Sequence, residues 1–206
     1  QLHCSISRSA DLTASATIST DEGPALADIA DLLSRLVRIP SVNPPGDESE
    51  VAAVVADRLR AAGLEVELFE AAPRRVSVVG RLRGTGGGPT LILNGHTDVQ
   101  PAANGWTRDP FGAEIVDGRL YGRGSMDMKA GITAMILTAE ALARSPQKLR
   151  GDLVITAVAD EVGGGHLGTG YLLKHCGLRG DMAVVCEPTG EQVYVAHRGT
   201  LWVEIE

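Results

Sequence analysis

The sequence is poor in aromatic residues, cysteines and long apolar runs. Aromatic side chains make up only 3% of the 206 residues, so the core has to be built from Ala, Val, Leu and Ile. No apolar run approaches the roughly 20 residues that a membrane-spanning helix needs, and we expect no membrane partner. Three cysteines at wide spacing favour reduced thiols, and hence a cytoplasmic protein, over a disulfide framework.

The chain also lacks a long run of basic residues. Its net charge is -7, and phosphate binding needs clustered Lys and Arg, so we expect no nucleic-acid partner. Hydrophobic residues make up 44% of the chain, which is typical of a globular protein. The length allows one sizeable domain, or one domain and the start of another.

Residues 1–23 differ in composition from the rest of the chain. They are rich in Ser, Thr and Ala and have no long apolar core, which argues against a secretory signal. We expect this segment to be a disordered leader.

Hydrophobic periodicity divides the remainder into alternating helices and strands. The expected helices cover residues 24–38, 48–62, 128–144 and 168–175. The expected strands cover residues 64–70, 76–83, 90–94, 152–158, 182–186 and 193–197, with a short hairpin around Asp117 and Gly118. This alternation indicates an α/β fold, a layered α/β/α arrangement around a largely parallel mixed sheet.

Acidic residues and one histidine follow three of the predicted strands. His96 and Asp98 come after strand 90–94, Asp160 and Glu161 after strand 152–158, and Glu187 after strand 182–186. In such folds ligands bind just past the carboxyl ends of the sheet strands. We therefore expect these side chains to line one site.

Each of these residues also has an ordinary structural explanation. A lone His after a strand is usually a surface or packing residue, and Asp127 could simply be the N-cap of helix 128–144. The Gly-rich segment before Asp127 lacks the Gly-Lys-Ser/Thr ending of a phosphate-binding loop, which argues against a nucleotide-binding domain. The adjacent acids Asp160 and Glu161, however, are costly beside a buried strand unless a positive group neutralises them.

A metal ion would neutralise this group of acids. Nitrogen and oxygen ligands suit zinc, and also cobalt or manganese, and Asp98 could hold the second ring nitrogen of His96. Two metals about 3.5–4 Å apart, bridged by a carboxylate, polarise a carbonyl and generate hydroxide near neutral pH. A further carboxylate then has to take the proton of the attacking water.

Several ordered motifs resemble those of the co-catalytic zinc hydrolases. This family includes acetylornithine deacetylase, succinyl-diaminopimelate desuccinylase, aminoacylase and carboxypeptidase G. The resemblance runs from about residue 24 to the end, and the set of motifs is highly specific. The motifs are Ile-Pro-Ser-Val-Asn-Pro-Pro-Gly (39–46), Asn-Gly-His-Thr-Asp-Val-Gln-Pro (94–101), Trp106 with Asp109-Pro110-Phe111, Leu-Tyr-Gly-Arg-Gly-Ser-Met-Asp-Met-Lys-Ala-Gly (120–131) and Glu187-Pro188-Thr189.

The resemblance implies a role for each residue of the site. It implies that His96 and Glu187 are ligands of one zinc ion, that Asp98 is the partner of His96, and that Asp127 bridges two zinc ions. In this family a cis peptide often follows the bridging Asp. Cobalt or manganese could replace zinc.

The acid pair after strand 152–158 departs from the family pattern. The family has Asp-Glu-Glu, where the first Glu is the general base and the second is a metal ligand, whereas this chain has Asp160-Glu161-Val162. In one alignment Glu161 is a metal ligand and Asp160 is the base. In the other Glu161 is the base and Val162 stands where a ligand is expected. We favour the first alignment, because Val-Gly-Gly commonly follows the ligand Glu.

The resemblance also implies the domain organisation and the activity. Residues 24–192 resemble the N-terminal portion of the metal-binding catalytic domain. Residues 193–206 resemble the start of a lid and dimerisation domain. The rest of that domain and the family's last His ligand are expected to lie beyond Glu206. The implied activity is metal-dependent hydrolysis of amide bonds in N-acyl amino acids or small peptides, as in a deacetylase, desuccinylase or carboxypeptidase, and the full-length parent is expected to be a homodimer. The alternative is an inactive, truncated or degenerate metal-binding fragment.

Overall fold

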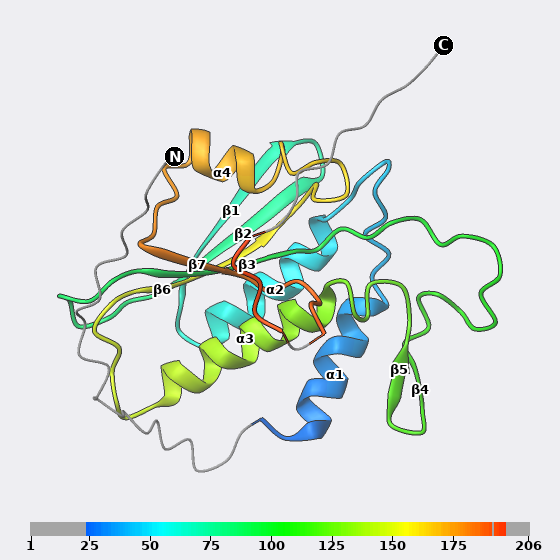
Figure 1. The fold of residues 1–206 in the computed structure, drawn as a ribbon, viewed down its shortest axis with the longest axis horizontal. Coiled ribbons are helices and arrows are strands. Elements are labelled where there is room, and N and C mark those ends of the chain that lie inside the picture. Colours follow the sequence, from blue (N-terminus) through cyan, green and yellow to red (C-terminus); the bar gives the residue numbers. More distant parts are fainter. Residues whose placement is uncertain (1–23, 191, 197–206) are drawn as a thin grey trace, which may run out of the picture.

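The computed structural model describes residues 24–190 and 192–196 and contains four helices and seven strands in that part of the chain (Figure 1). The helices are α1 (Leu26–Val37), α2 (Ser49–Ala61), α3 (Lys129–Arg144) and α4 (Thr169–His175). The strands are β1 (Glu65–Ala72), β2 (Arg75–Leu82), β3 (Leu91–His96), β4 (Glu114–Val116), β5 (Arg119–Tyr121), β6 (Leu153–Val158) and β7 (Met182–Val185).

Five of the strands form one mixed sheet in the order β1-β2-β6-β3-β7. Strands β6, β3 and β7 run parallel to one another, whereas β1 pairs with β2 and β2 with β6 in antiparallel fashion. Strand β6 lies at the centre, and all six of its residues are buried. This explains its unbroken apolar sequence, because a strand covered on both faces has no solvent side.

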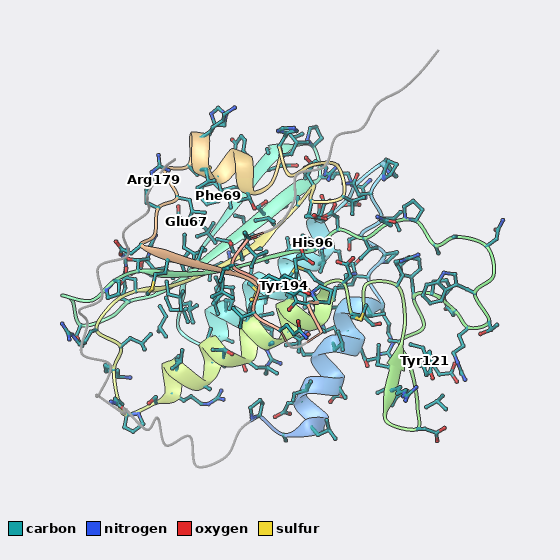
Figure 2. The ribbon with its side chains drawn as sticks, in the orientation of Figure 1. Glu67, Phe69, His96, Tyr121, Arg179 and Tyr194 are labelled. Carbon is teal, nitrogen blue, oxygen red and sulfur yellow. The ribbon has the colours of Figure 1, made fainter. Side chains whose placement is uncertain are left out.

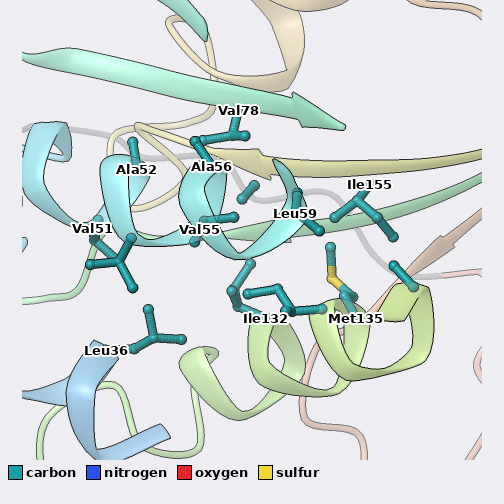
Figure 3. Close-up of a cluster of buried hydrophobic side chains, with 14 of the residues drawn as sticks. Leu36, Val51, Ala52, Val55, Ala56, Leu59, Val78, Ile132, Met135 and Ile155 are labelled. Carbon is teal, nitrogen blue, oxygen red and sulfur yellow. The ribbon is translucent and has the colours of Figure 1, made fainter. Parts of the chain in front are cut away.

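Helices cover both faces of this sheet. Helices α1, α2 and α3 pack on one face, where Leu36, Leu59 and Ile132 meet Val78 and Ile155 in the larger of two core clusters (Figure 3). On the other face Leu172 of α4 packs against Val79, Ile92 and Val154. Burying each such aliphatic side chain contributes about 1.5–3 kcal/mol relative to exposure. The three layers confirm the predicted α/β/α arrangement and hold the strand ends in place.

Most of the predicted elements are confirmed, with ends that move by one or two residues. The short hairpin around Asp117 and Gly118 is present as β4 and β5. The predicted strand 193–197 is wrong as far as it can be followed, because residues 193–196 are in neither a helix nor a strand. Position 197, the rest of the predicted lid segment and the predicted leader 1–23 lie outside the described residues. Among the helices of the described part, none is long and apolar enough to cross a membrane.

Candidate metal centre

The predicted site residues meet at the carboxyl ends of the parallel strands. His96 is the last residue of β3, Glu161 follows β6, and Glu187 follows β7. Asp127 comes from the loop before α3, which packs against β3 and β6. His96 therefore lies where β3 meets the N-terminal end of α3 (Figure 2).

Three of these side chains are close enough to bind one metal ion. The Nε2 atom of His96 lies 3.0 Å from Oδ1 of Asp127 and 3.5 Å from Oε1 of Glu187. One ligand atom from each residue lies within 4.8 Å of the other two. Within residues 24–190 and 192–196 this is the one group of three or more such side chains with that spacing. One nitrogen and two carboxylate oxygens are a donor set that suits zinc and similar divalent ions.

The other ring nitrogen of His96 is held in place by Asp98. Nδ1 lies 2.8 Å from the backbone carbonyl oxygen of Asp98 and 3.5 Å from its Oδ1 atom. Because a carbonyl oxygen can only accept, Nδ1 is the donor. The lone pair of the neutral ring is therefore on Nε2, which faces Asp127 and Glu187. This arrangement is typical of metal-binding histidines.

Asp98 also connects His96 to two other segments of the chain. Its carboxylate is fully buried and accepts hydrogen bonds from Nδ2 of Asn43 at 2.8 Å and from the backbone N–H groups of Glu161 and Val162, both at 3.1 Å. Burial raises the pKa of Asp98, but His96, Asn43 and the N–H of Val162 lower it more, so the net shift is downward. The side chain is therefore a stable buried anion.

Crowded acids change the protonation of the site. Burial lowers the pKa of His96, but the hydrogen bond and charge of Asp98 and the charges of Glu187 and Glu161 raise it to about 9. The pKa of Glu187 is raised as well. Burial raises it most, the charges of Asp127, Glu161 and Asp98 raise it further, and the charge of His96 opposes these effects. The electrostatics thus favour a bound cation.

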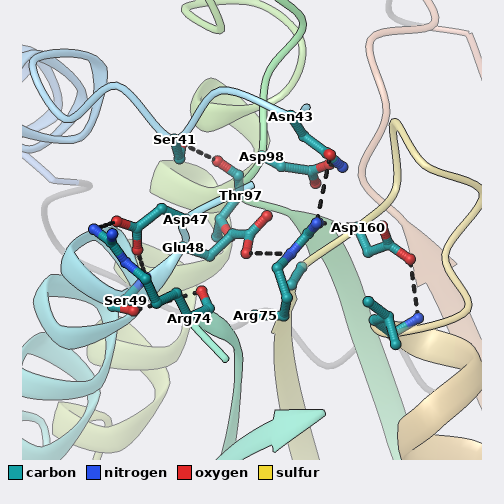
Figure 4. A network of polar contacts seen from close by, with 12 residues as sticks. Ser41, Asn43, Asp47, Glu48, Ser49, Arg74, Arg75, Thr97, Asp98 and Asp160 are labelled. Carbon is teal, nitrogen blue, oxygen red and sulfur yellow. Dashed lines mark hydrogen bonds and ion pairs between the residues drawn. The ribbon is translucent and has the colours of Figure 1, made fainter. Parts of the chain in front are cut away.

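The two acids after β6 occupy different surroundings. The side chain of Glu161 is 55% exposed, and its Oε2 atom lies 3.7 Å from Nε2 of His96, beside the three-residue cluster. Asp160 is buried, with a φ of 67°. Its Oδ1 atom pairs with Arg75 at 3.1 Å, and its Oδ2 atom accepts the backbone N–H of Leu167 at 3.0 Å (Figure 4). Both of its carboxylate oxygens are thus already engaged.

The loop that carries Asp127 is held by a buried lysine. The peptide bond after Asp127 is cis, as the resemblance implies. Nζ of Lys129 donates to the backbone oxygens of Leu36 and Ile39, at 2.9 and 2.7 Å, and so ties this loop to the end of α1. Burial lowers the pKa of Lys129 to about 8, against the charge of Asp98, which raises it.

A glycine brings Glu187 close to Asp127. A Cβ atom at Gly131, in the first turn of α3, would lie 2.4 Å from the backbone oxygen of Cys186, the residue before Glu187. Only glycine lets the helix and the end of β7 approach this closely. The contacts of Gly131, Asn43, Arg75 and Lys129 were not predicted from the sequence. Asn43, Lys129 and Gly131 lie within the quoted motifs, whereas nothing in the sequence marked Arg75.

Comparison with known proteins shows the family of the chain. The model of peptidase family M20/M25/M40 matches residues 92–199, which is more than half of the sequence. The chain belongs to peptidase family M20/M25/M40. The resemblance drawn from the motifs is therefore confirmed.

Two relatives of this chain are each about twice as long as the part of them that the chain matches. It is 38% identical over 192 residues to succinyl-diaminopimelate desuccinylase of Rhizorhabdus wittichii, a match covering 87% of this chain and 49% of that protein. It is 39% identical over 185 residues to the protein of the same name from Methylorubrum populi, covering 82% and 47%. The chain thus spans about half the length of the curated relatives it matches.

Solved structures of the family share the fold. Human carnosine dipeptidase 1 aligns with a TM-score of 0.66 and 25% identity, over 78% of this chain and 38% of that one. The metallo-carboxypeptidase Sso-CP2 of Sulfolobus solfataricus aligns with a TM-score of 0.66 and 24% identity, over 76% and 36%.

Metal binding is predicted to release a proton. Because the pKa of His96 is about 9, a metal ion has to displace the proton on Nε2 at neutral pH, and the affinity should rise by up to about tenfold per pH unit until pH 9. Calorimetric zinc titrations at pH 7.5, in buffers of different ionisation enthalpy, should show about one proton released per ion. The exposed His175→Ala variant is the control and should behave like the wild type. A buffer-independent enthalpy would contradict this prediction.

The substitution Gly131→Ala is predicted to weaken metal binding although Ala favours helices. The added Cβ would collide with the backbone of Cys186 and displace Glu187 from Asp127. A misplaced supporting group costs about 10–100-fold in metal affinity, which a competition titration with a fluorescent zinc chelator would measure. An affinity equal to that of the wild type would show that this close approach does not set the position of Glu187.

Proposed function

We propose that this chain is the metal-binding part of a hydrolase that cleaves the amide bond of an N-acyl amino acid or a small peptide. The observation that supports the proposal most directly is the cluster of His96, Asp127 and Glu187, whose ligand atoms lie within 4.8 Å of one another. Membership of a peptidase family points to the same chemistry.

The donor set fits a divalent metal ion. His96, Asp127 and Glu187 would hold it, and Asp98 would keep the imidazole in the tautomer with a free Nε2. A bound zinc, cobalt or manganese ion would polarise the substrate carbonyl and lower the pKa of water. The resemblance implies a second ion; Asp127 would help to hold it, and its other ligands would have to be residues outside the described part, or Glu161 in the alignment that makes Glu161 a ligand.

Glu161 is the group we propose for proton transfer. Its carboxylate lies beside the ligand cluster and is accessible to water, so it can take the proton of the attacking water and pass it to the leaving amine. Asp160 is the other candidate from the sequence. Its pairing with Arg75 and with the N–H of Leu167 supports an anchoring role instead. This choice adopts the second alignment, in which Val162 stands at the position of a ligand acid.

The relatives suggest the substrate class. Those at 38–39% identity are named succinyl-diaminopimelate desuccinylase, whereas the dipeptidase structure is 25% identical. We therefore place N-succinyl amino acids before dipeptides. The test is to strip the chain of metal, restore it with zinc, cobalt or manganese, and assay both substrate classes. Amine release that persists after complete metal removal would overturn the proposal.

A metal-binding protein without turnover is the alternative function. The observation that favours it is Val162, which follows Glu161 where the family has a second acid. Zinc binding at His96, with no hydrolysis of either substrate class by the restored chain, would support this alternative.

The substitution Glu161→Gln is predicted to lower kcat while metal binding is retained. Gln keeps the shape of the side chain but cannot accept the proton, so kcat should fall about a hundredfold or more. Glu67→Gln is the matched control, because Glu67 is exposed on β1, away from His96 (Figure 2). The measurement is kcat together with the metal content of each variant. Full activity of Glu161→Gln would exclude Glu161 as the proton-transfer group, and loss of the metal would assign it to the ligands.

A further inference from the structure

A buried arginine connects three segments beneath the metal centre. Arg75, the first residue of β2, is 7% exposed. Its Nε atom donates to Oε2 of Glu48 at 2.9 Å, and its Nη2 atom donates to Oδ1 of Asp160 at 3.1 Å. Its Nη1 atom lies 3.4 Å from Oδ1 of Asn43 and from the backbone oxygen of Pro45. Figure 4 shows Asn43, Glu48 and Asp160 around the guanidinium of Arg75.

The contacts of Arg75 close a ring with those of Asp98. Asn43 accepts from Arg75 through its oxygen and donates to Asp98 through Nδ2. Asp98 accepts the backbone N–H groups of Glu161 and Val162. The segment after β6 is therefore anchored twice, at Asp160 by Arg75 and at the next two residues by Asp98.

The surroundings leave little space for any other arrangement of these groups. A Cβ atom at Gly46 would lie 2.1 Å from Nη1 of Arg75, and one at Gly163 would lie 2.3 Å from Oδ1 of Asp160. Two further hydrogen bonds hold the loop from Asp160 to Gly168. The N–H of Gly165 donates to the backbone oxygen of Asp160, and the N–H of Leu167 donates to its Oδ2 atom. The position of Asp160 thus determines where the loop begins.

Stability alone is a weak reason for this network. Buried ion pairs often contribute no more than apolar residues of the same volume. Here one arginine faces two buried acids, and Oε1 of Glu48 has no hydrogen-bond partner among the described residues. Burial raises the pKa of Glu48 and the charge of Arg75 lowers it, and the net result is a pKa of about 7. What the network provides is a fixed position for the start of the acid loop, because Arg75 holds Asp160 and Glu161 is the next residue.

We propose that Arg75 is a positioning residue, which fixes loop 160–168 through Asp160 and thereby places the carboxylate of Glu161 beside the metal ligands. Among the described residues, the hydrogen bonds and ion pairs of Arg75 go to Glu48, Asn43, Pro45 and Asp160, and none goes to His96, Asp127 or Glu187. Its loss should therefore affect the acid loop and proton transfer but leave the metal site largely intact. The effect on turnover rests on the proposed function, whereas the effect on the loop does not.

The substitution Arg75→Met tests this proposal in the 206-residue chain. Hydrogen exchange should become about tenfold faster or more at the amides of Glu161, Val162 and Leu167, while the amides of β6 stay protected. Zinc affinity should stay within about threefold of the wild type, because the roughly 10–100-fold losses seen on mutating supporting groups come from groups that contact a ligand directly, whereas Arg75 contacts neither His96, Asp127 and Glu187 nor Asp98. Where hydrolysis is measurable, kcat should fall about a hundredfold with little change in KM.

Two further variants separate positioning from general stability. Asp160→Asn removes the charge that Arg75 holds in the loop and should loosen the same three amides, which keeps the test valid if Arg75→Met does not fold. Glu48→Gln breaks the other ion pair of the same guanidinium and should leave the loop protected. Arg81→Met, on the same strand, removes a partly exposed arginine that pairs with Asp152 and is the surface control.

The outcomes distinguish this proposal from the proposed function. Unchanged loop exchange in Arg75→Met or in Asp160→Asn would overturn it. So would equal loosening in Glu48→Gln, or joint loss of zinc affinity and of β6 protection in a folded Arg75→Met. Unchanged kcat with a loosened loop would overturn the link to Glu161. If no substrate is hydrolysed, the proposed function fails, and the exchange and zinc data still decide the role of Arg75 in the loop.

Discussion

The buried carboxylate of Asp98 is the constraint on which the rest of the site depends. A fully buried anion is costly unless donors and positive charge surround it. Asp98 obtains them from Asn43, from the backbone of the loop after β6 and from His96. Three segments that are far apart in the sequence have to meet at this one side chain, and their meeting orients the imidazole and the acid loop together.

The fold supplies the geometry that this constraint requires. Parallel strands β3, β6 and β7 end at the same edge of the sheet, so the residues that follow them converge without long loops. The apolar layers on both faces hold those ends. Lys129 ties the loop that carries Asp127 to the end of α1, and Gly131 lets α3 approach the end of β7 closely. Several carboxylates then surround one imidazole. The mutual repulsion of the carboxylates is relieved when a cation binds between them.

Sequence patterns predict the parts of this structure that depend on local rules. The apolar run of β6 and the helical spacing of α3 locate the core elements, and the acids directly after strands locate the edge of the site. The role of Arg75 could not be predicted, because its partners Glu48 and Asp160 lie 27 and 85 residues away and an arginine in a strand is normally exposed. The proposed choice of Glu161 over Asp160 as the proton-transfer group likewise rests on their three-dimensional surroundings, since both residues follow β6. The apolar alternation near Val193 predicted a strand that residues 193–196 do not form.

The coordination of zinc in the 206-residue chain is the most direct test of the account. X-ray absorption at the zinc edge should show nitrogen and oxygen ligands at about 2.0–2.2 Å, with a single imidazole and no sulfur, and this pattern should disappear in His96→Ala. A sulfur ligand at about 2.3 Å, which Cys186 beside Glu187 could supply, or a spectrum that His96→Ala leaves unchanged, would contradict the assignment of His96, Asp127 and Glu187 as the metal ligands.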